Sequence, residues 1–385
     1  MTINGYMRKN GDFGTRNHVL ILPTVFCVNG VVRKIVKEVP EAVGINHAYG
    51  CSRGGLRDIE ILFRMLSGMV HNPNVGGVIL VGLGCEVSNS KNLMPHIQDA
   101  GKPIEIFNVQ DDGGSLKTAE KATAAARQML EKVNCQQRVP MPWNKLTVSM
   151  KCGGSDAMSG VTANTALGAV SDWLVEKGAT VMFGENTEMI GADHILKRRA
   201  KNEQVAGWIG KMVEEAEKLT HDIMGPLAGL VISPGNMDGG MSTIAEKSMG
   251  CIFKGGSSTI NQVVDYGEVP AEHGLILQDG PGNDGDAMTG MAASGSQLII
   301  FSTGRGTPIG FPILPVIKVS SNSKTYEAMP DDIDINAGIL LEGTSLNVLR
   351  DRIIELMIRV INGEKTKAES NEMDAFTFMT VDPPF

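Results

Sequence analysis

Short apolar runs recur along this chain and alternate with segments in which apolar residues have helical spacing. Runs typical of buried strands cover residues 18–26, 78–81 and 104–109, whereas residues 56–69 and 115–133 have the pattern of amphipathic helices. Strands that are apolar throughout are typical of a parallel sheet covered by helices. We therefore expect an α/β fold with right-handed crossover connections.

The alternation breaks once, at residues 138–143, where two prolines precede a tryptophan. A chain of 385 residues is too long for one ordinary core. We expect two Rossmann-like parallel-sheet domains with helices on both faces, an N-terminal one at 1–138 and a C-terminal catalytic one at 144–385. The remaining expected elements are strands at 45–49, 146–150, 180–183, 274–278, 297–301 and 316–320, and helices at 28–39, 91–100, 167–177, 203–224 and 347–362. Residues 233–248 are expected to be irregular, and the tail at 376–385 to pack on the body or on a partner subunit.

Composition excludes several functional classes. The formal net charge is −8 and there is no basic tract, which argues against nucleic-acid binding. No apolar run reaches the roughly 20 residues that span a bilayer, and the first residues do not resemble a signal peptide. We expect a cytoplasmic protein whose thiols stay reduced.

Four of the six cysteines stand where a predicted strand ends or beside glycine, namely Cys27, Cys51, Cys85 and Cys152. Ligands gather outside the carboxyl ends of strands in open α/β sheets, so these thiols could converge on one centre. There is no CxxC pair, which excludes a zinc ribbon. The alternative is that each thiol is a small buried apolar group, and this fits Cys135 best.

Other segments carry polar groups suited to a site. His47 precedes Cys51 by four residues, and Glu86 follows Cys85. The carboxylates at 185 and 188 follow an expected strand and could bind a cation or act as a base, although the same pattern commonly begins a helix. The loop at 302–308 combines hydroxyls, glycines and Arg305, as an anion site requires. Segments 281–284 and 235–251 have turn-like composition.

Seven ordered strings together resemble the altronate and galactarate dehydratases. They lie at residues 22–30, 49–52, 82–86, 152–156, 247–251, 281–284 and 301–308, and the resemblance extends from about Gly5 to about Asn362. The large subunit of sulfolactate sulfo-lyase is similar as a sister branch. Thiols at 27, 51, 85, 152 and 251 favour the dehydratase branch, in which water and not sulfite leaves.

The resemblance implies an iron-dependent enzyme that converts a sugar acid to a 2-keto-3-deoxy acid. Full-length relatives carry a small N-terminal domain before the motif that begins here at Gly5. We therefore expect either a small partner subunit or a missing small domain. A homo-oligomer is also expected, and neither nucleic acid nor a membrane is expected as a partner.

The resemblance also suggests roles for individual residues. As metal ligands we expect Cys51, Cys85 and Cys152, with Cys27, Cys251 and Glu185 in reserve, around Fe²⁺ or a 4Fe-4S cluster. A lone Fe²⁺ would instead favour Glu86, His47 and Glu185. His47 or Lys247 would be the base, Glu86 is a further catalytic candidate, and Arg305 would hold the substrate carboxylate. The expected substrate-binding residues are Ser155, Asp156, Asn283, Asp284, Ser302, Thr303 and Arg305.

Three other functions remain open from the sequence. The chain could be a C–S lyase subunit of the sulfo-lyase type. It could be a non-catalytic protein that binds iron or senses redox state through its thiols. It could also be a structural subunit whose catalytic residues lie on the small domain.

Overall fold

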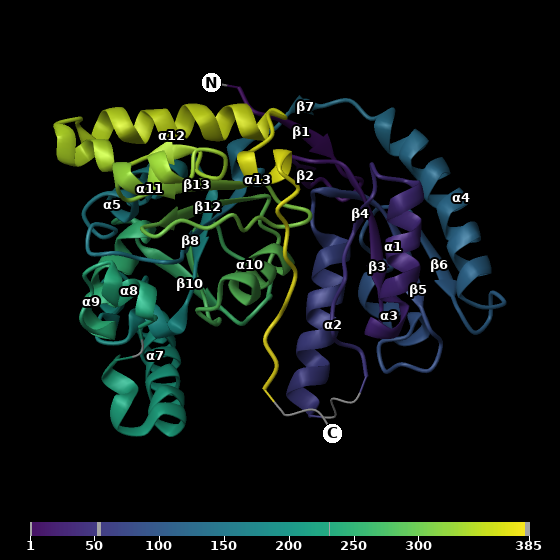
Figure 1. The fold of residues 1–385 in the computed structure, drawn as a ribbon, viewed down its shortest axis with the longest axis horizontal. Helices are drawn as coiled ribbons and strands as arrows, with labels where there is room; N and C mark the ends of the chain where they lie inside the picture. Colours follow the sequence, from purple (N-terminus) through teal and green to yellow (C-terminus); the bar gives the residue numbers. More distant parts are fainter. Residues whose placement is uncertain (1, 52–54, 231, 382–385) are drawn as a thin grey trace.

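A computed structural model describes residues 2–51, 55–230 and 232–381 and contains two parallel α/β domains side by side (Figure 1). The first has a four-stranded sheet in the order β4-β3-β5-β6, and all its pairs are parallel. The strands are β3 (His18–Pro23), β4 (Val43–Gly44), β5 (Val75–Gly82) and β6 (Ile104–Asn108). Helices α1 (Asn29–Glu38) and α4 (Ser115–Asn134) cover one face, while α2 (Leu56–His71) and α3 (Ser90–Ile97) cover the other.

The second domain has a seven-stranded parallel sheet in the order β10-β11-β9-β8-β12-β13-β14. Its strands are β8 (Thr147–Cys152), β9 (Thr180–Phe183), β10 (Ile260–Val264), β11 (Gly274–Gln278), β12 (Leu298–Thr303), β13 (Val316–Ser320) and β14 (Ile335–Asn336). Along β12, Leu298 and Ile300 face one core, whereas Ile299 and Phe301 face the other. Both faces are therefore buried, as the apolar runs predict.

The helices of the second domain divide between these two cores. Helices α5 (Ala163–Glu176), α7 (Glu203–Met224) and α12 (Leu346–Ile361) contribute to the larger core, and α10 (Asp284–Ala293) lies against α2 of the first domain. Shorter helices are α6 (Asp193–Arg198), α8 (Pro234–Asp238), α9 (Ile244–Cys251), α11 (Ser323–Ala328) and α13 (Lys367–Ser370), with 3₁₀ turns that include η3 (Asn186–Met189), η4 (Gly225–Leu230) and η5 (Ile252–Gly255). None of the helices in the described ranges is long and apolar enough to cross a membrane.

A small antiparallel sheet and the C-terminal segment join the domains. Strands β2 (Phe13–Gly14), β1 (Asn4–Met7) and β7 (Val139–Pro140) form that sheet, and β7 falls where the sequence pattern breaks. The final described segment runs down beside α2 (Figure 1). There the Phe378 ring stacks on the Tyr49 ring, with their centroids 3.7 Å apart, and the Tyr49 hydroxyl donates a hydrogen bond to the Phe378 carbonyl at 2.6 Å. The tail thus packs on the body of the chain as far as residue 381.

The expected α/β class with parallel sheets and helices on both faces is confirmed. Two local expectations are wrong. Residues 233–248 are not irregular, because Ser233 and Thr243 cap α8 and α9 through their side chains. The strand expected at 45–49 is instead the two-residue β4, which ends at Gly44.

Candidate active site and metal centre

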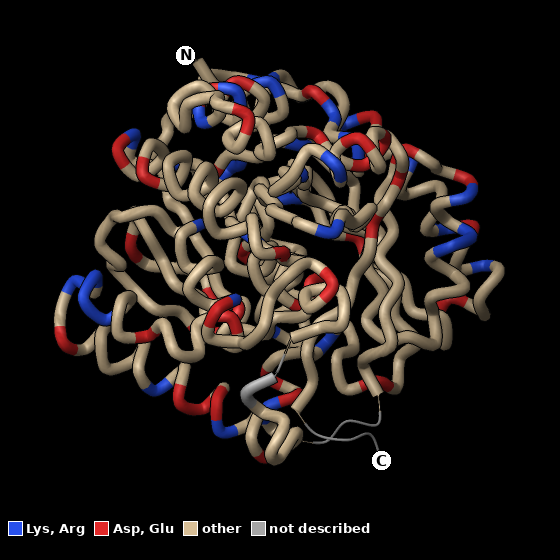
Figure 2. Tube along the Cα trace, turned by 60° about the vertical axis from the view of Figure 1, so that its left-hand side comes forward, with Lys and Arg blue, Asp and Glu red and all other residues tan. Residues whose placement is uncertain are grey.

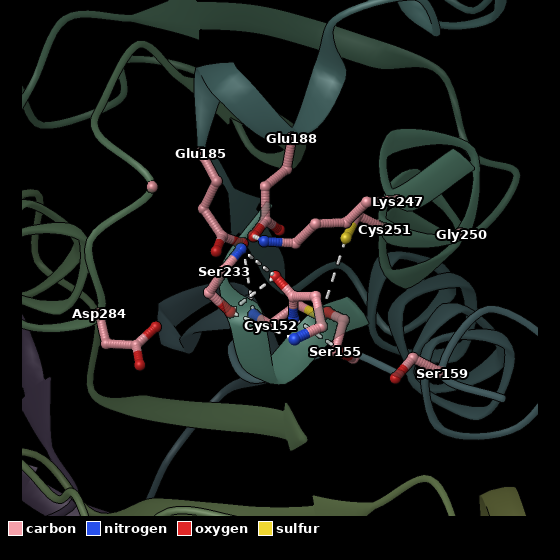
Figure 3. Close-up of polar contacts among 12 residues, drawn as sticks. Cys152, Ser155, Ser159, Glu185, Glu188, Ser233, Lys247, Gly250, Cys251 and Asp284 are labelled. Carbon is pink, nitrogen blue, oxygen red and sulfur yellow. Dashed lines mark hydrogen bonds and ion pairs between the residues drawn. The ribbon is translucent and has the colours of Figure 1, made fainter. Parts of the chain in front are cut away.

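Polar side chains gather where β8 and β9 end side by side (Figure 3). Cys152 is the last residue of β8, and Glu185 and Glu188 follow β9. Cys251 ends α9, which lies against η3. A parallel sheet places the carboxyl ends of neighbouring strands at one edge, which is where α/β proteins bind ligands.

Two buried thiols face each other in this group. The Cys251 Sγ lies 3.8 Å from the Cys152 Sγ, and the Ser155 Oγ lies 2.9 Å from the same Cys152 sulfur. The hydrogen bond from Cys251, assisted by Ser155, lowers the pKa of Cys152 to about 6, although burial opposes the shift. The same bond and burial raise the pKa of Cys251 well above its usual value. The pair therefore holds one proton readily and favours a thiolate at Cys152.

Three lysines neutralise the carboxylates around the thiols. The Lys151 and Lys254 ammonium groups both donate to Glu185, and all three side chains are buried. The Lys247 Nζ lies 2.7 Å from a Glu188 oxygen, and the Lys254 Nζ lies 3.6 Å from the other oxygen. Because these ammonium groups and carboxylates are all removed from water, the free-energy cost of burying each charge must be offset by the opposite charges beside it.

The two glutamates are held in different states by their surroundings. Burial and the charge of Glu188 raise the pKa of Glu185 to about 7, against the opposing effect of Lys151 and Lys254. Burial would also raise the pKa of Glu188, but Lys247 and Lys254 lower it to about 2. Glu188 is therefore an ionised acceptor at neutral pH. Its Oε2 atom is buried and accepts no hydrogen bond from the residues that the structure describes.

Ligand atoms of Cys152, Glu188 and Cys251 lie within 4.8 Å of one another, and all three residues are buried. Two thiols and a carboxylate suit a single Fe²⁺ or Zn²⁺ ion. A cubane cluster uses more thiolates than the two that meet here. Within the described residues, this group fits one metal ion better than a cluster.

The other expected residues of the second domain lie beside this group. Asp156 accepts hydrogen bonds from Ser159, Ser321 and Asn322, so its carboxylate holds loops together. Ser302 donates to Asn164, and Thr303 accepts from the Gly306 amide. Asn283 caps α10. The Asp284 carboxylate reaches the Lys151 Nζ at 2.8 Å and is 36% exposed.

Arg305 lies on the loop after β12, and its side chain is exposed. Its amide and that of Gly304 donate to the Gly154 carbonyl at 2.9 and 3.1 Å, so this loop sits against the one that carries Ser155. In the described chain, no ion-pair partner of Arg305 is found. Its role as a carboxylate clamp stays a prediction.

The first-domain candidates lie elsewhere. Cys27, Cys51 and Cys85 are exposed, and none of them joins the group around Cys152. Glu86 is buried and accepts from Thr24 and from the amides of Leu83 and Gly84, which fixes its own loop. The expected ligand set of Cys51, Cys85 and Cys152 is therefore not brought together, whereas the reserve residues Cys251 and Glu185 lie beside Cys152.

His47 is also held by backbone. Its Nε2 bonds the Pro23 carbonyl at 2.8 Å, and its Nδ1 accepts from the Tyr49 amide at 3.1 Å. Burial lowers the pKa of His47 to about 4, so the ring is neutral. Action as a base would require one of these bonds to break.

Two charged residues of the site, Lys151 and Lys254, were not selected from the sequence, whereas Glu188 was considered together with Glu185 as a possible cation ligand or base but was not among the expected metal ligands. A lysine inside the apolar run of β8 is a usable signal, since lysine is almost never fully buried without a partner. Glu188 follows Glu185 at a spacing that also begins helices. Lys254 has no local signature, because only the tertiary fold brings η5 to β9.

Family models match most of the chain. The model for the second domain of D-galactarate dehydratase/altronate hydrolase matches residues 5–134, and the C-terminal model of D-galactarate/altronate dehydratase matches residues 143–383. The chain belongs to this family. It is accordingly an enzyme of the hydro-lyase class.

Curated relatives agree with that assignment. An altronate dehydratase of Bacillus subtilis is 38% identical over 96% of this chain and 76% of its own length. A galactarate dehydratase (L-threo-forming) of Escherichia coli is 37% identical over 94% of this chain and 73% of its length. The (2R)-sulfolactate sulfo-lyase subunit beta of Chromohalobacter salexigens is 34% identical over 96% of this chain and 95% of its length.

A solved glycosyl transferase family 9 structure from Veillonella parvula is similar only at a TM-score of 0.20 and 9% identity, which carries no argument.

Proposed function

We propose that this chain removes water from a sugar acid of the altronate or galactarate type and releases a 2-keto-3-deoxy acid, with iron as cofactor. The observation that carries the proposal is the buried group of lysines, carboxylates and thiols at the edge of the second sheet. It lies in the part of the chain matched by the C-terminal family model. The expected small subunit or domain is part of the same proposal.

The reaction requires charge stabilisation at two points. The proton α to a carboxylate is weakly acidic, and hydroxide is a poor leaving group, so cations must stabilise the enediolate and an acid must protonate the departing oxygen. Iron, when bound, would supply Lewis-acid polarisation of the substrate oxygens. Cys152, Glu188 and Cys251 are the described residues that would hold it.

Lys247 is the ammonium group of this site best suited to meet the substrate, because its side chain is 13% exposed while those of Lys151 and Lys254 are buried. Burial opposes its charge, but Glu188 and the neighbouring thiols raise the pKa of Lys247 above its usual value. It is therefore protonated at neutral pH, so it can bind the substrate anion and give its proton to the departing hydroxide, which leaves as water. The partly exposed Asp284 is the carboxylate placed to take the C2 proton.

The test is formation of a keto acid from altronate and from galactarate by the full chain, with and without a small partner subunit. Lys247→Met should lower kcat/KM by at least about 100-fold, the scale of one lost charge-stabilising group. Lys211→Met is the matched control, because Lys211 is 72% exposed on α7. Equal activity of the two variants would contradict the role of Lys247.

A C–S lyase activity is the second candidate, because the match to the sulfo-lyase beta subunit covers nearly all of both chains. Release of sulfite from sulfolactate, without keto acid from either sugar acid, would favour it. Bound metal without turnover of any of the three substrates would instead favour the non-catalytic reading.

A further inference from the structure

The pair of thiols at the edge of the second sheet is built for a particular kind of metal. We propose that Cys152 and Cys251 act as a thiolate pair that binds, together with Glu188, one thiophilic divalent metal ion such as Fe²⁺, Co²⁺ or Zn²⁺, and that Asn164 positions the pair. Equating this ion with the iron of the dehydratase rests on the proposed function. The binding site itself does not.

The spacing of the sulfurs supports a shared ion. Two thiolates bound tetrahedrally at about 2.3 Å from one metal are separated by about 3.8 Å. The Cys152 and Cys251 sulfurs are 3.8 Å apart. The third donor is present as well, because a Glu188 carboxylate oxygen lies within 4.8 Å of both sulfurs, and Glu188 has a buried oxygen that accepts no hydrogen bond within the described part of the chain.

The charges of the surrounding residues support a dication. The carboxylates of Glu185, Glu188 and Asp284 balance the ammonium groups of Lys151, Lys247 and Lys254. Conversion of both thiols to thiolates adds two negative charges to this buried group. A divalent ion restores neutrality, and uncompensated charge is costly in such an environment.

The backbone brings the two thiols together in a way that only small residues allow. A Cβ on Gly160 would lie 2.8 Å from the Gly250 Cα, so the turn after β8 touches the end of α9 main chain to main chain. Asn164 links the same two segments. Its Nδ2 donates to the Gly250 carbonyl at 3.0 Å and lies 3.7 Å from the Cys152 sulfur, while its Oδ1 accepts from Ser302.

Thiolate donors also determine which metal binds. Soft sulfur ligands favour iron, cobalt and zinc, whereas Mg²⁺ and Ca²⁺ prefer oxygen ligands. The expected thiols of the first domain, Cys27, Cys51 and Cys85, are exposed and take no part in this site.

The test is titration of the metal-stripped full chain with Co²⁺, read by the near-ultraviolet charge-transfer band of Co²⁺–thiolate bonds and by elemental analysis. We expect about one tightly bound ion per chain. Cys152→Ser and Cys251→Ser should each weaken binding by at least about 100-fold. Asn164→Asp should weaken it by about 10-fold and shift the charge-transfer band.

Cys135→Ser is the matched control, because Cys135 is an exposed cysteine. Retention of wild-type affinity and band in Cys152→Ser or Cys251→Ser, or equally tight Mg²⁺ binding, would overturn the site.

A measurement without substitutions covers the case in which a variant does not fold. At a urea concentration at which the two buried thiols of the metal-free wild-type chain become labelled, bound Zn²⁺ should protect Cys152 and Cys251 from a small thiol-alkylating reagent, as read by peptide mass spectrometry, and leave Cys135 reactive. Unchanged labelling of both buried thiols would refute the proposal. If Co²⁺ binds as expected but no sugar acid is dehydrated, the proposed function fails and the metal site stands.

Discussion

Glu185 combines an unusual backbone with an unusual set of partners. Its φ of 80° lies in the left-handed region, which residues other than glycine rarely adopt. The side chain is buried between Lys151 and Lys254, and the Cys152 amide also reaches it at 3.3 Å. Backbone strain of this kind persists only where surrounding contacts hold it, and it is common at functional sites. Glu185 thus holds the Lys151 and Lys254 ammonium groups in place beside the two thiols.

Replacement of Glu185 by glutamine should therefore be costly. The amide keeps the shape but removes the carboxylate that Lys151 and Lys254 share, which leaves Lys151 with the partly exposed Asp284 and Lys254 with the more distant Glu188. Removing one partner of a buried ion pair costs about 3–5 kcal/mol. The measurement is the free energy of unfolding in urea. Glu215→Gln is the control, because Glu215 is exposed and pairs loosely with Lys211. A loss no larger than in the control would show that Glu185 does not hold the lysines.

At the scale of elements, the position of α9 depends on the contact between Gly160 and Gly250. Gly160→Ala would place a methyl group 2.8 Å from main chain that cannot rotate away, so α9 must shift. We expect a loss of about 1–3 kcal/mol in unfolding free energy and a changed alkylation rate at Cys251. Gly207→Ala on α7 is the control, because its added Cβ would meet nothing within 4 Å. It should be neutral or gain up to about 1 kcal/mol. Equal unfolding free energies and equal Cys251 alkylation rates in the two variants would contradict a close contact between Gly160 and Gly250.

The elements differ in how far the sequence predicts them. Residues 180–183, 203–224, 274–278 and 316–320 were expected with the observed bounds of β9, α7, β11 and β13, since their patterns are long or fully apolar. Helix α10 was missed because its capping Asn283 is typical of a turn, and because the residues after Asp286 are small or apolar on every side of the helix and give no amphipathic pattern. The sequence pattern likewise predicted only part of the site. Cys152 ends a strand and Glu185 follows one, so their place at the sheet edge could be expected from the pattern, whereas Cys251 was named as a ligand only from the family resemblance, because it ends a helix that tertiary packing brings to β8.

At the scale of the whole molecule, the domains share a core and several ion pairs. Met65 and Leu66 of α2 pack in one cluster with Met288 and Ala292 of α10. A Cβ on Gly68 would lie 2.5 Å from the Ala293 side chain, so the two helices are in close contact. In the view of Figure 2, acidic and basic residues are interspersed along the chain. The interface is thus maintained by buried apolar contacts and local charge pairs.

Asp265 provides a pH-dependent part of that interface. It follows β10 and accepts from Arg57 at 2.7 and 3.0 Å, and its Oδ2 lies 2.8 Å from the Arg64 guanidinium. Burial would raise the pKa of Asp265, but Arg57 and Arg64 lower it to about 2 from 3.8. Because this pKa is lower in the folded chain than in the unfolded chain, the ionised carboxylate stabilises the fold above pH 4. That contribution to the free energy of unfolding is lost as the pH falls from about 4 to about 2.

Asp265→Asn should therefore reduce the unfolding free energy by about 1 kcal/mol at pH 7, a value discounted for partial solvent exposure. The difference from the wild-type chain should shrink as the pH falls below 4. Urea unfolding at pH 7, 4 and 3 measures it, and Asp222→Asn is the control, because Asp222 is 59% exposed and pairs with Lys218 on α7. A difference between Asp265→Asn and wild type that stays constant from pH 7 to pH 3 would show that the carboxylate charge does not link the two domains.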